Sequence, residues 1–101
     1  MSAVGKGWKD AIAAPETAIQ ALMARNPAAD AALETERLQM AIDANVLTDF
    51  VQANGMGTID TERMVSAIEK TKPVYEFQTE PDMTLYFDSS FLPTDGTLQL
   101  K

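Results

Sequence analysis

The sequence contains neither cysteine nor histidine among its 101 residues. Disulfides, thiol nucleophiles, Ser-His-Asp triads and zinc sites built on sulfur or imidazole ligands are therefore excluded for this chain. The lack of cysteine fits a reducing and an oxidising compartment equally well. No apolar run approaches the ~18 residues that a transmembrane helix needs.

Basic residues are scarce: eight Lys and Arg stand against 15 Asp and Glu, which gives a net charge of −7. No basic cluster offsets the repulsion from phosphate groups, so we expect neither nucleic acid nor an anionic membrane as a direct partner. Apolar residues make up 46% of the chain, as in a globular protein. We expect one helical domain over residues 1–101.

Residues 1–16 do not have the pattern of a secretory signal peptide. Trp8 and Asp10 stand where such a peptide has its apolar core. If the protein is exported, this stretch does not supply the signal.

Helical spacing dominates the first quarter of the chain. Val4, Trp8 and Ile12 recur every four residues and predict one apolar helix stripe. Pro15, followed by an acidic residue, predicts the start of a second helix. Asn26 and the proline after it predict the end of that helix.

Three further helices are predicted between residues 28 and 72. The first runs from about Ala28 to Asn45. Thr48 is the expected N-cap of a short helix over 49–54. Asp60 is the expected N-cap of a helix over 61–71, with Met64, Val65 and Ile68 pointing inward.

The last 28 residues hold five of the seven aromatic residues and show little periodicity. Val74, Tyr75 and Phe77 suggest a short extended piece, and residues 81–87 a helical turn with Asp82 near its start. We expect this tail to be irregular and its aromatic side chains to pack over the helices. Strand alternation is weak throughout, so the predicted fold is mainly α, with four to five short helices.

Residues 52–63, QANGMGTIDTER, have the length of the calcium loop of an EF-hand, with Gly57 at position 6 and Asp60 at position 9. Ligand charge argues against calcium, because Gln52, Met56 and Arg63 occupy positions 1, 5 and 12. A bidentate Glu is required at position 12. We interpret the loop as structural: Asn54-Gly55 ends one helix and Asp60 caps the next.

Candidate functional residues are few. A lone tryptophan on an apolar stripe is usually a core residue, but tryptophan also lines sites for small organic ligands, so Trp8 is the candidate ligand-binding residue. No catalytic residue, metal ligand or cofactor is predicted. Ser89 and Ser90 have no histidine base to activate them, and we expect no enzyme activity.

The order of several phrases carries a resemblance. GWKDAIAAPETAIQALMARNP, AALETERLQMAIDANVLT, VQANGMGTIDTERMVSAIE and the closing FLP at 91–93 follow one another over residues 3–93. This order resembles the C-terminal part of periplasmic substrate-binding proteins of ABC importers, in the branch that serves nitrate, sulfonates or taurine, and thiamine precursors.

The resemblance implies a non-catalytic piece of a two-lobed solute-binding component, periplasmic in location and related to membranes only through a transporter. It implies that most ligand-contacting loops belong to regions upstream of the matched part, so this piece is not expected to bind solute alone. Helix faces that normally cover a lobe would then be exposed, and we expect a homodimer to bury them.

Two alternatives stay open from the residues. The first is a freestanding helical module that binds another protein. The second is a calcium sensor, if the loop at 52–63 binds the ion despite its poor ligand set.

Overall fold

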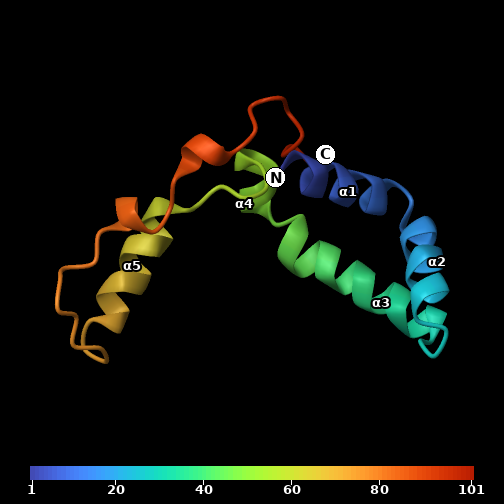
Figure 1. The fold of residues 1–101 in the computed structure, drawn as a ribbon, viewed down its shortest axis with the longest axis horizontal. Coiled ribbons are helices and arrows are strands. Elements are labelled where there is room, and N and C mark those ends of the chain that lie inside the picture. Colours follow the sequence, from blue (N-terminus) through green and yellow to red (C-terminus); the bar gives the residue numbers. More distant parts are fainter. The chain divides into compact units, whose positions relative to one another are not determined.

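The computed structural model describes all 101 residues and is mainly helical, with no strand, as the sequence predicts. Its α-helices are α1 (Ser2–Ala13), α2 (Pro15–Arg25), α3 (Ala31–Ala41), α4 (Asp49–Asn54) and α5 (Thr61–Thr71) (Figure 1). A π-helical turn, η1 (Ile42–Val46), extends α3. Two 3-10 turns, η2 (Met83–Leu85) and η3 (Ser89–Phe91), lie in the tail.

The chain divides into two compact units. Unit 1 comprises Met1–Gly57 with Pro93–Lys101, and unit 2 comprises Thr58–Leu92. The prediction of one domain over residues 1–101 stays a prediction.

Prolines set the boundaries of the first two helices in unit 1. Ala14 precedes Pro15 and adopts φ −144°, ψ 70°, which ends α1 and lets the proline occupy the first turn of α2. Asn26 precedes Pro27 and ends α2 in the same way, at φ −134°, ψ 79°. α2 contacts both α1 and α3, and its Ile19 is buried.

The third helix differs from the prediction at both ends. It begins at Ala31 rather than Ala28, because the Asp30 carboxylate accepts a hydrogen bond from the Leu33 N–H at 3.0 Å and so caps the helix there. At its other end the Leu47 N–H donates to the Ile42 carbonyl at 2.7 Å. This bond spans five residues and widens the last turn into η1, with Ile42 buried.

The C-terminal segment closes unit 1 against α1 and α4. The Met56 N–H donates to the Leu98 carbonyl at 2.8 Å, and the Lys9 ammonium donates to the Gly96 carbonyl at 2.9 Å. Gly5 allows the close approach, since a β-carbon there would lie 2.6 Å from the Thr97 carbonyl oxygen. Both chain ends accordingly lie beside α4 in Figure 1.

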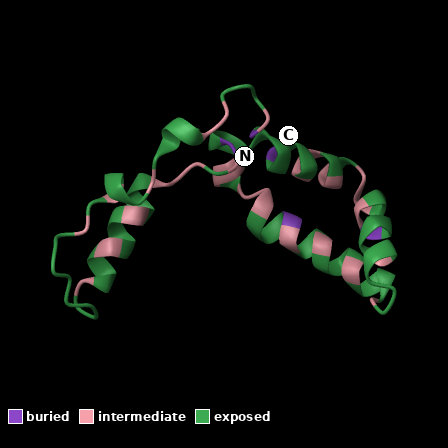
Figure 2. Ribbon diagram, viewed as in Figure 1, coloured by how far each residue is buried: buried purple, intermediate pink, exposed green.

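The core of unit 1 is small. Its buried apolar side chains are Ile19, Ile42, Leu98 and Leu100, and no buried polar or charged residue accompanies them. Purple ribbon is correspondingly sparse in Figure 2. Val4, Leu22, Leu33 and Met40, from α1, α2 and α3, stay exposed. We refer to these four residues as the apolar helix faces of unit 1.

Unit 2 is built on α5, which begins where the sequence predicts. The Asp60 carboxylate accepts a hydrogen bond from the Arg63 N–H at 3.0 Å. Lys70 lies in the last turn, where its positive charge interacts favourably with the negative end of the helix dipole. The predicted N-cap Thr48 of α4 is confirmed as well, and Asp82, expected near the start of a helical turn, caps η2.

The expected packing of the tail is wrong for most of its aromatic residues, although Phe87 is half-buried. Tyr75, Tyr86 and Phe91 are 62%, 62% and 80% exposed, so these rings do not cover the helices. Val74 and Tyr75 form no extended piece, because both N–H groups donate to the Thr71 carbonyl in the turn that ends α5. Short turns capped by polar side chains fix the backbone of this segment, and its exposed aromatic side chains do not contribute to that structure.

The inward orientation of α5 residues is also partly wrong. Val65 is 48% exposed, and none of the α5 side chains is fully buried, although Met64 and Ile68 are half-buried. A single helix flanked by irregular chain has too little surface around it to bury a whole apolar stripe. None of the helices in the chain combines the length and apolar content that a membrane crossing requires.

Candidate functional site

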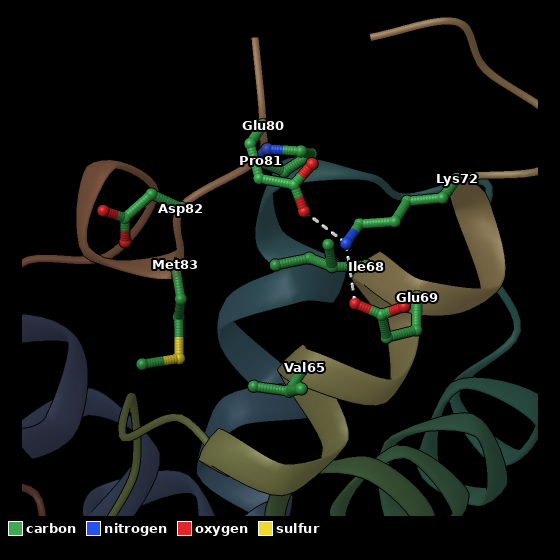
Figure 3. A pocket seen from close by; sticks show the side chains of 8 residues that line it. All are labelled: Val65, Ile68, Glu69, Lys72, Glu80, Pro81, Asp82 and Met83. Carbon is green, nitrogen blue, oxygen red and sulfur yellow. Dashed lines mark hydrogen bonds and ion pairs between the residues drawn. The ribbon is translucent and has the colours of Figure 1, made fainter.

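An open groove of about 400 Å³ lies between α5 and the start of the tail (Figure 3). α5 contributes Val65, Ile68 and Glu69, and Lys72 follows at its C-terminal end. Residues 80–83 form the opposite side, with Met83 facing the apolar side chains of α5. The groove thus has apolar walls and one charged rim.

Lys72 organises that rim. Its ammonium donates to the Glu69 carboxylate at 2.8 Å and forms an ion pair with Glu80, so it ties the helix to the tail. The hydrogen bonds to Glu69 and then Glu80 raise the pKa of Lys72 above its ordinary value of 10.5. The amine therefore stays protonated at neutral pH and is unsuited to act as a nucleophile or a general base there.

A second groove of about 360 Å³ shares Met83 with the first. Its walls combine apolar side chains with hydroxyl groups and consist of Thr58, Ile59, Thr61, Met83, Thr84, Phe87, Ser89 and Leu92. No carboxylate or cation lines it. Such a surface suits contact with an apolar side chain of another molecule better than it suits acid–base chemistry.

A third groove, of about 520 Å³, lies between α1 and α2 in unit 1. It is lined mainly by alanines, together with Gly7, Asp10 and Thr17. Small side chains leave this surface shallow and open, so it offers area for packing but no convergent polar groups that would orient a small ligand.

Three Asp-x-Ser/Thr turns shape the last twenty residues: Asp82 with Thr84, Asp88 with Ser90, and Asp95 with Thr97. In each, the carboxylate accepts a hydrogen bond from the N–H two residues ahead, at 2.9, 2.9 and 3.0 Å. The sequence prediction covers only Asp82, as a residue near the start of a helical turn, although the repeated pattern is the signal for all three.

Hydrogen bonds from these N–H groups and from the hydroxyl groups of the same Ser and Thr residues lower the pKa of each carboxyl group below its ordinary value of 3.8. The main cause is the backbone N–H of Thr84 for Asp82, and the hydroxyl groups of Ser90 and Thr97 for Asp88 and Asp95. Because the ionised carboxylate is the acceptor, the folded turns favour the charged form.

We predict that acid loosens these turns in a narrow window. Each carboxyl group has a lower pKa in the folded chain than the 3.8 of the unfolded chain, so its ionised form stabilises the fold. This stabilisation is complete above pH 3.8 and is lost as the pH falls through the lower pKa of the folded chain. Amide proton shifts of Thr84, Ser90 and Thr97, followed by NMR from about pH 5 to about pH 2, should move upfield below that value.

The variant Asp88→Asn supplies the control, because its side chain keeps an acceptor oxygen but does not titrate. The Ser90 amide should then stop responding to acid, while the amides of Thr84 and Thr97 still move. An unchanged response of Ser90 would show that its shift has another origin.

The loop that resembles an EF-hand is used structurally in both units. In unit 1, Asn54 ends α4, Gly55 adopts φ 88° and ψ 154°, and the Met56 N–H is bound to Leu98. Gly57 adopts φ 84°, which again favours glycine. In unit 2, Asp60 caps α5. No group of three or more acidic side chains gathers where it could hold a metal ion.

We predict that calcium does not bind this loop. Titration of about 1 mM calcium, a concentration that saturates even weak extracellular sites, should release no heat beyond dilution. Met56 and Arg63 leave too few oxygen ligands. A saturable signal that disappears in Asp60→Asn would establish a calcium site and contradict this account.

Trp8, the candidate ligand-binding residue, lies on α1 and is half-buried. It does not line any of the three grooves described above. Its neighbour Gly7 borders the alanine-rich groove, and Lys9 holds the C-terminal segment through Gly96. A role for Trp8 in binding a solute stays a prediction.

The grooves thus combine apolar walls with few charges, and at the rim of the first groove Lys72 pairs with Glu69 and Glu80. Comparison of the chain with protein-family models, with curated proteins and with solved structures gives no match.

Proposed function

We propose that this chain is a non-catalytic helical part of a solute-binding component of an ABC importer, and that it acts by packing against another protein surface. The observation that carries the proposal is the balance between buried and exposed apolar residues. Four apolar side chains are buried, whereas twelve large apolar residues are exposed. Where exposed apolar side chains gather on one face, a further protein element typically covers them.

The link to solute-binding components comes from the order of phrases in residues 3–93. Helix boundaries in that region agree with those phrases: Pro15 starts α2, Asn26 ends it, and Asp60 starts α5 after a glycine-rich turn. In such a component the apolar helix faces of unit 1 would rest on a lobe. The location would be periplasmic, and a solute such as an anion or a small organic molecule would bind mainly outside this piece.

In the absence of a lobe, a second copy of the chain is the proposed cover for these faces. Val4, Leu22, Leu33 and Met40 are 50%, 38%, 45% and 65% exposed. Burial of apolar surface contributes roughly 25 cal/mol per Å², and a symmetric dimer buries the same residues twice.

The DNA upstream of Met1 tests the link to a solute-binding component. The proposal predicts that the reading frame continues upstream and encodes alternating strands and helices of the kind that build an α/β lobe. A frame closed by a stop codon shortly before Met1, with no lobe encoded beside it, would contradict the proposal.

A freestanding protein-binding module is the second candidate, and one observation favours it. Leu98 and Leu100 lie beyond the part of the chain that carries the resemblance, yet they supply half of the four buried apolar residues. The chain thus completes part of its core with its own last residues. If the upstream frame is closed, this second function takes precedence.

A further inference from the structure

Residues 74–91, here called the aromatic–acidic segment, combine exposed apolar side chains with charges of one sign. Tyr75, Tyr86 and Phe91 are more than 60% exposed, as are Val74 and Leu85. No Lys or Arg occurs between Lys72 and Lys101, whereas Glu76, Glu80, Asp82 and Asp88 fall within the segment. It therefore presents large apolar side chains among charges of one sign.

The apolar side chains of the segment are held in place by local structure. The Tyr75 and Phe77 rings lie with their centroids 6.2 Å apart at 35° to each other. Leu85 belongs to η2 and Phe91 to η3, two turns capped by Asp82 and Asp88. The caps fix the backbone without covering the side chains, so the segment loses less conformational freedom on binding than an unstructured peptide would.

Charge decides what kind of surface can cover these residues. Lys72 already pairs with Glu69 and Glu80, and Glu76 has no cationic partner. The same segment of a second copy brings four more carboxylates and no Lys or Arg, so two such segments repel each other. An anionic membrane repels it for the same reason. A surface that carries Lys and Arg around an apolar groove satisfies both features.

We infer that the aromatic–acidic segment is a docking surface for a second, different protein, which presents an apolar groove bordered by Lys and Arg. Tyr86 and Phe91 enter the groove, and Glu76 faces its basic border. This surface belongs to unit 2 and is separate from the apolar helix faces of unit 1, so the inference does not depend on the proposed function.

Two synthetic helical peptides provide the probes: one carries leucines on one face and lysines on the other, and the second carries glutamates in place of the lysines. The peptides are titrated into the full ¹⁵N-labelled chain and followed by NMR. The inference predicts that the lysine peptide shifts amides mainly within residues 74–91, and that the shifts weaken as salt is raised. The glutamate peptide should leave the spectrum unchanged.

Variants separate the apolar contribution from the charge. The double variant Tyr86→Ala with Phe91→Ala should lower the affinity for the lysine peptide by at least about tenfold, since aromatic residues dominate protein interfaces. Glu76→Lys should lower the same affinity roughly two- to fivefold, which is the contribution expected of an exposed ion pair. Gln20→Ala, at an exposed position of α2 outside both surfaces, is the control and should leave the affinity unchanged. All these residues are exposed, so helix content by circular dichroism should stay constant.

Each remaining outcome overturns the inference. If both peptides bind equally, charge does not select the partner. If neither peptide binds, the segment is not a docking surface for such a groove. A dimer of the chain that Tyr86→Ala with Phe91→Ala dissociates makes a second copy the occupant. Cosedimentation with phosphatidylcholine vesicles that the same variant abolishes makes a membrane surface the occupant.

Discussion

Gly5→Ala and Gly7→Ala, two substitutions in the same helix, are expected to change stability in opposite directions. A β-carbon at Gly5 would lie 2.6 Å from the carbonyl oxygen of Thr97 and 3.2 Å from its carbon, both in the backbone. The C-terminal segment must then shift, and overpacking of this kind costs about 1–3 kcal/mol. Nothing lies within 4 Å of a β-carbon at Gly7.

Alanine also favours the helix over glycine by about 1 kcal/mol. Gly7→Ala should therefore stabilise the chain by about that amount, whereas in Gly5→Ala the gain is offset by the displaced segment. We expect a net loss of about 1–2 kcal/mol for Gly5→Ala. Urea unfolding, followed by circular dichroism and by Trp8 fluorescence at one fixed protein concentration, measures both.

Amide hydrogen exchange adds a local readout, because Gly5→Ala should also expose the Met56 N–H that donates to Leu98. The same direction of change in both variants, or full protection of Met56 in Gly5→Ala, would show that Thr97 does not lie against Gly5.

Leu98→Ala is expected to be the most damaging substitution of a side chain. Leu98 is 6% exposed, belongs to a core of only four buried apolar residues, and lies 3.4 Å from the position of a β-carbon at Gly5. Truncation of a buried leucine costs about 2–5 kcal/mol. We expect about 2–3 kcal/mol here, because a core this small can partly collapse into the space.

Leu85→Ala is the matched control, since it makes the same chemical change at a residue that is 80% exposed. Its unfolding free energy should lie within about 0.5 kcal/mol of the parent chain. If Leu98→Ala behaves like Leu85→Ala in urea, the C-terminal segment is not docked on α1 and α4, and the account of unit 1 fails.

Local signals predicted the helix boundaries well. Pro15, Thr48, Asp60 and Asp82 each act on the backbone within three residues, so neighbouring sequence is enough to place them. The three Asp-x-Ser/Thr turns are equally local, and the pattern around Asp88 and Asp95 is as visible in the sequence as that around Asp82. The start of α3 was misplaced because Ala28 and Ala29 suit a helix, whereas the Asp30 side chain selects the later start.

Distant contacts were not predictable in the same way. Leu98 is buried because Gly5, more than ninety positions earlier, lets the backbone approach, and no periodicity in the sequence reports that pairing. The π-helical turn η1 was not predictable either, because an apolar stripe over Leu38 and Ile42 fits an α-helix and a widened turn equally. The exposure of Tyr86 and Phe91 shows the converse, because their apolar character alone predicted burial.

The grooves of unit 2 are predictable only in part, because they depend on local signals and also on contacts between separate segments. Lys72 lies at the end of α5, but its pairing with Glu80 depends on the path of the chain through Pro73 and Pro81. Each proline fixes only its own φ, so the direction of the intervening residues could not be predicted from the sequence.

The central claim is that the apolar helix faces of unit 1 are covered by another protein surface, and by a second copy when the chain is alone. Light scattering coupled to gel filtration, across a range of concentrations, tests it most directly. The account predicts a dimer, twice the chain mass of 11.0 kDa. Met40→Lys with Leu33→Lys should dissociate it, whereas Tyr86→Ala with Phe91→Ala should not. A monomer of 11.0 kDa at every concentration would contradict the claim.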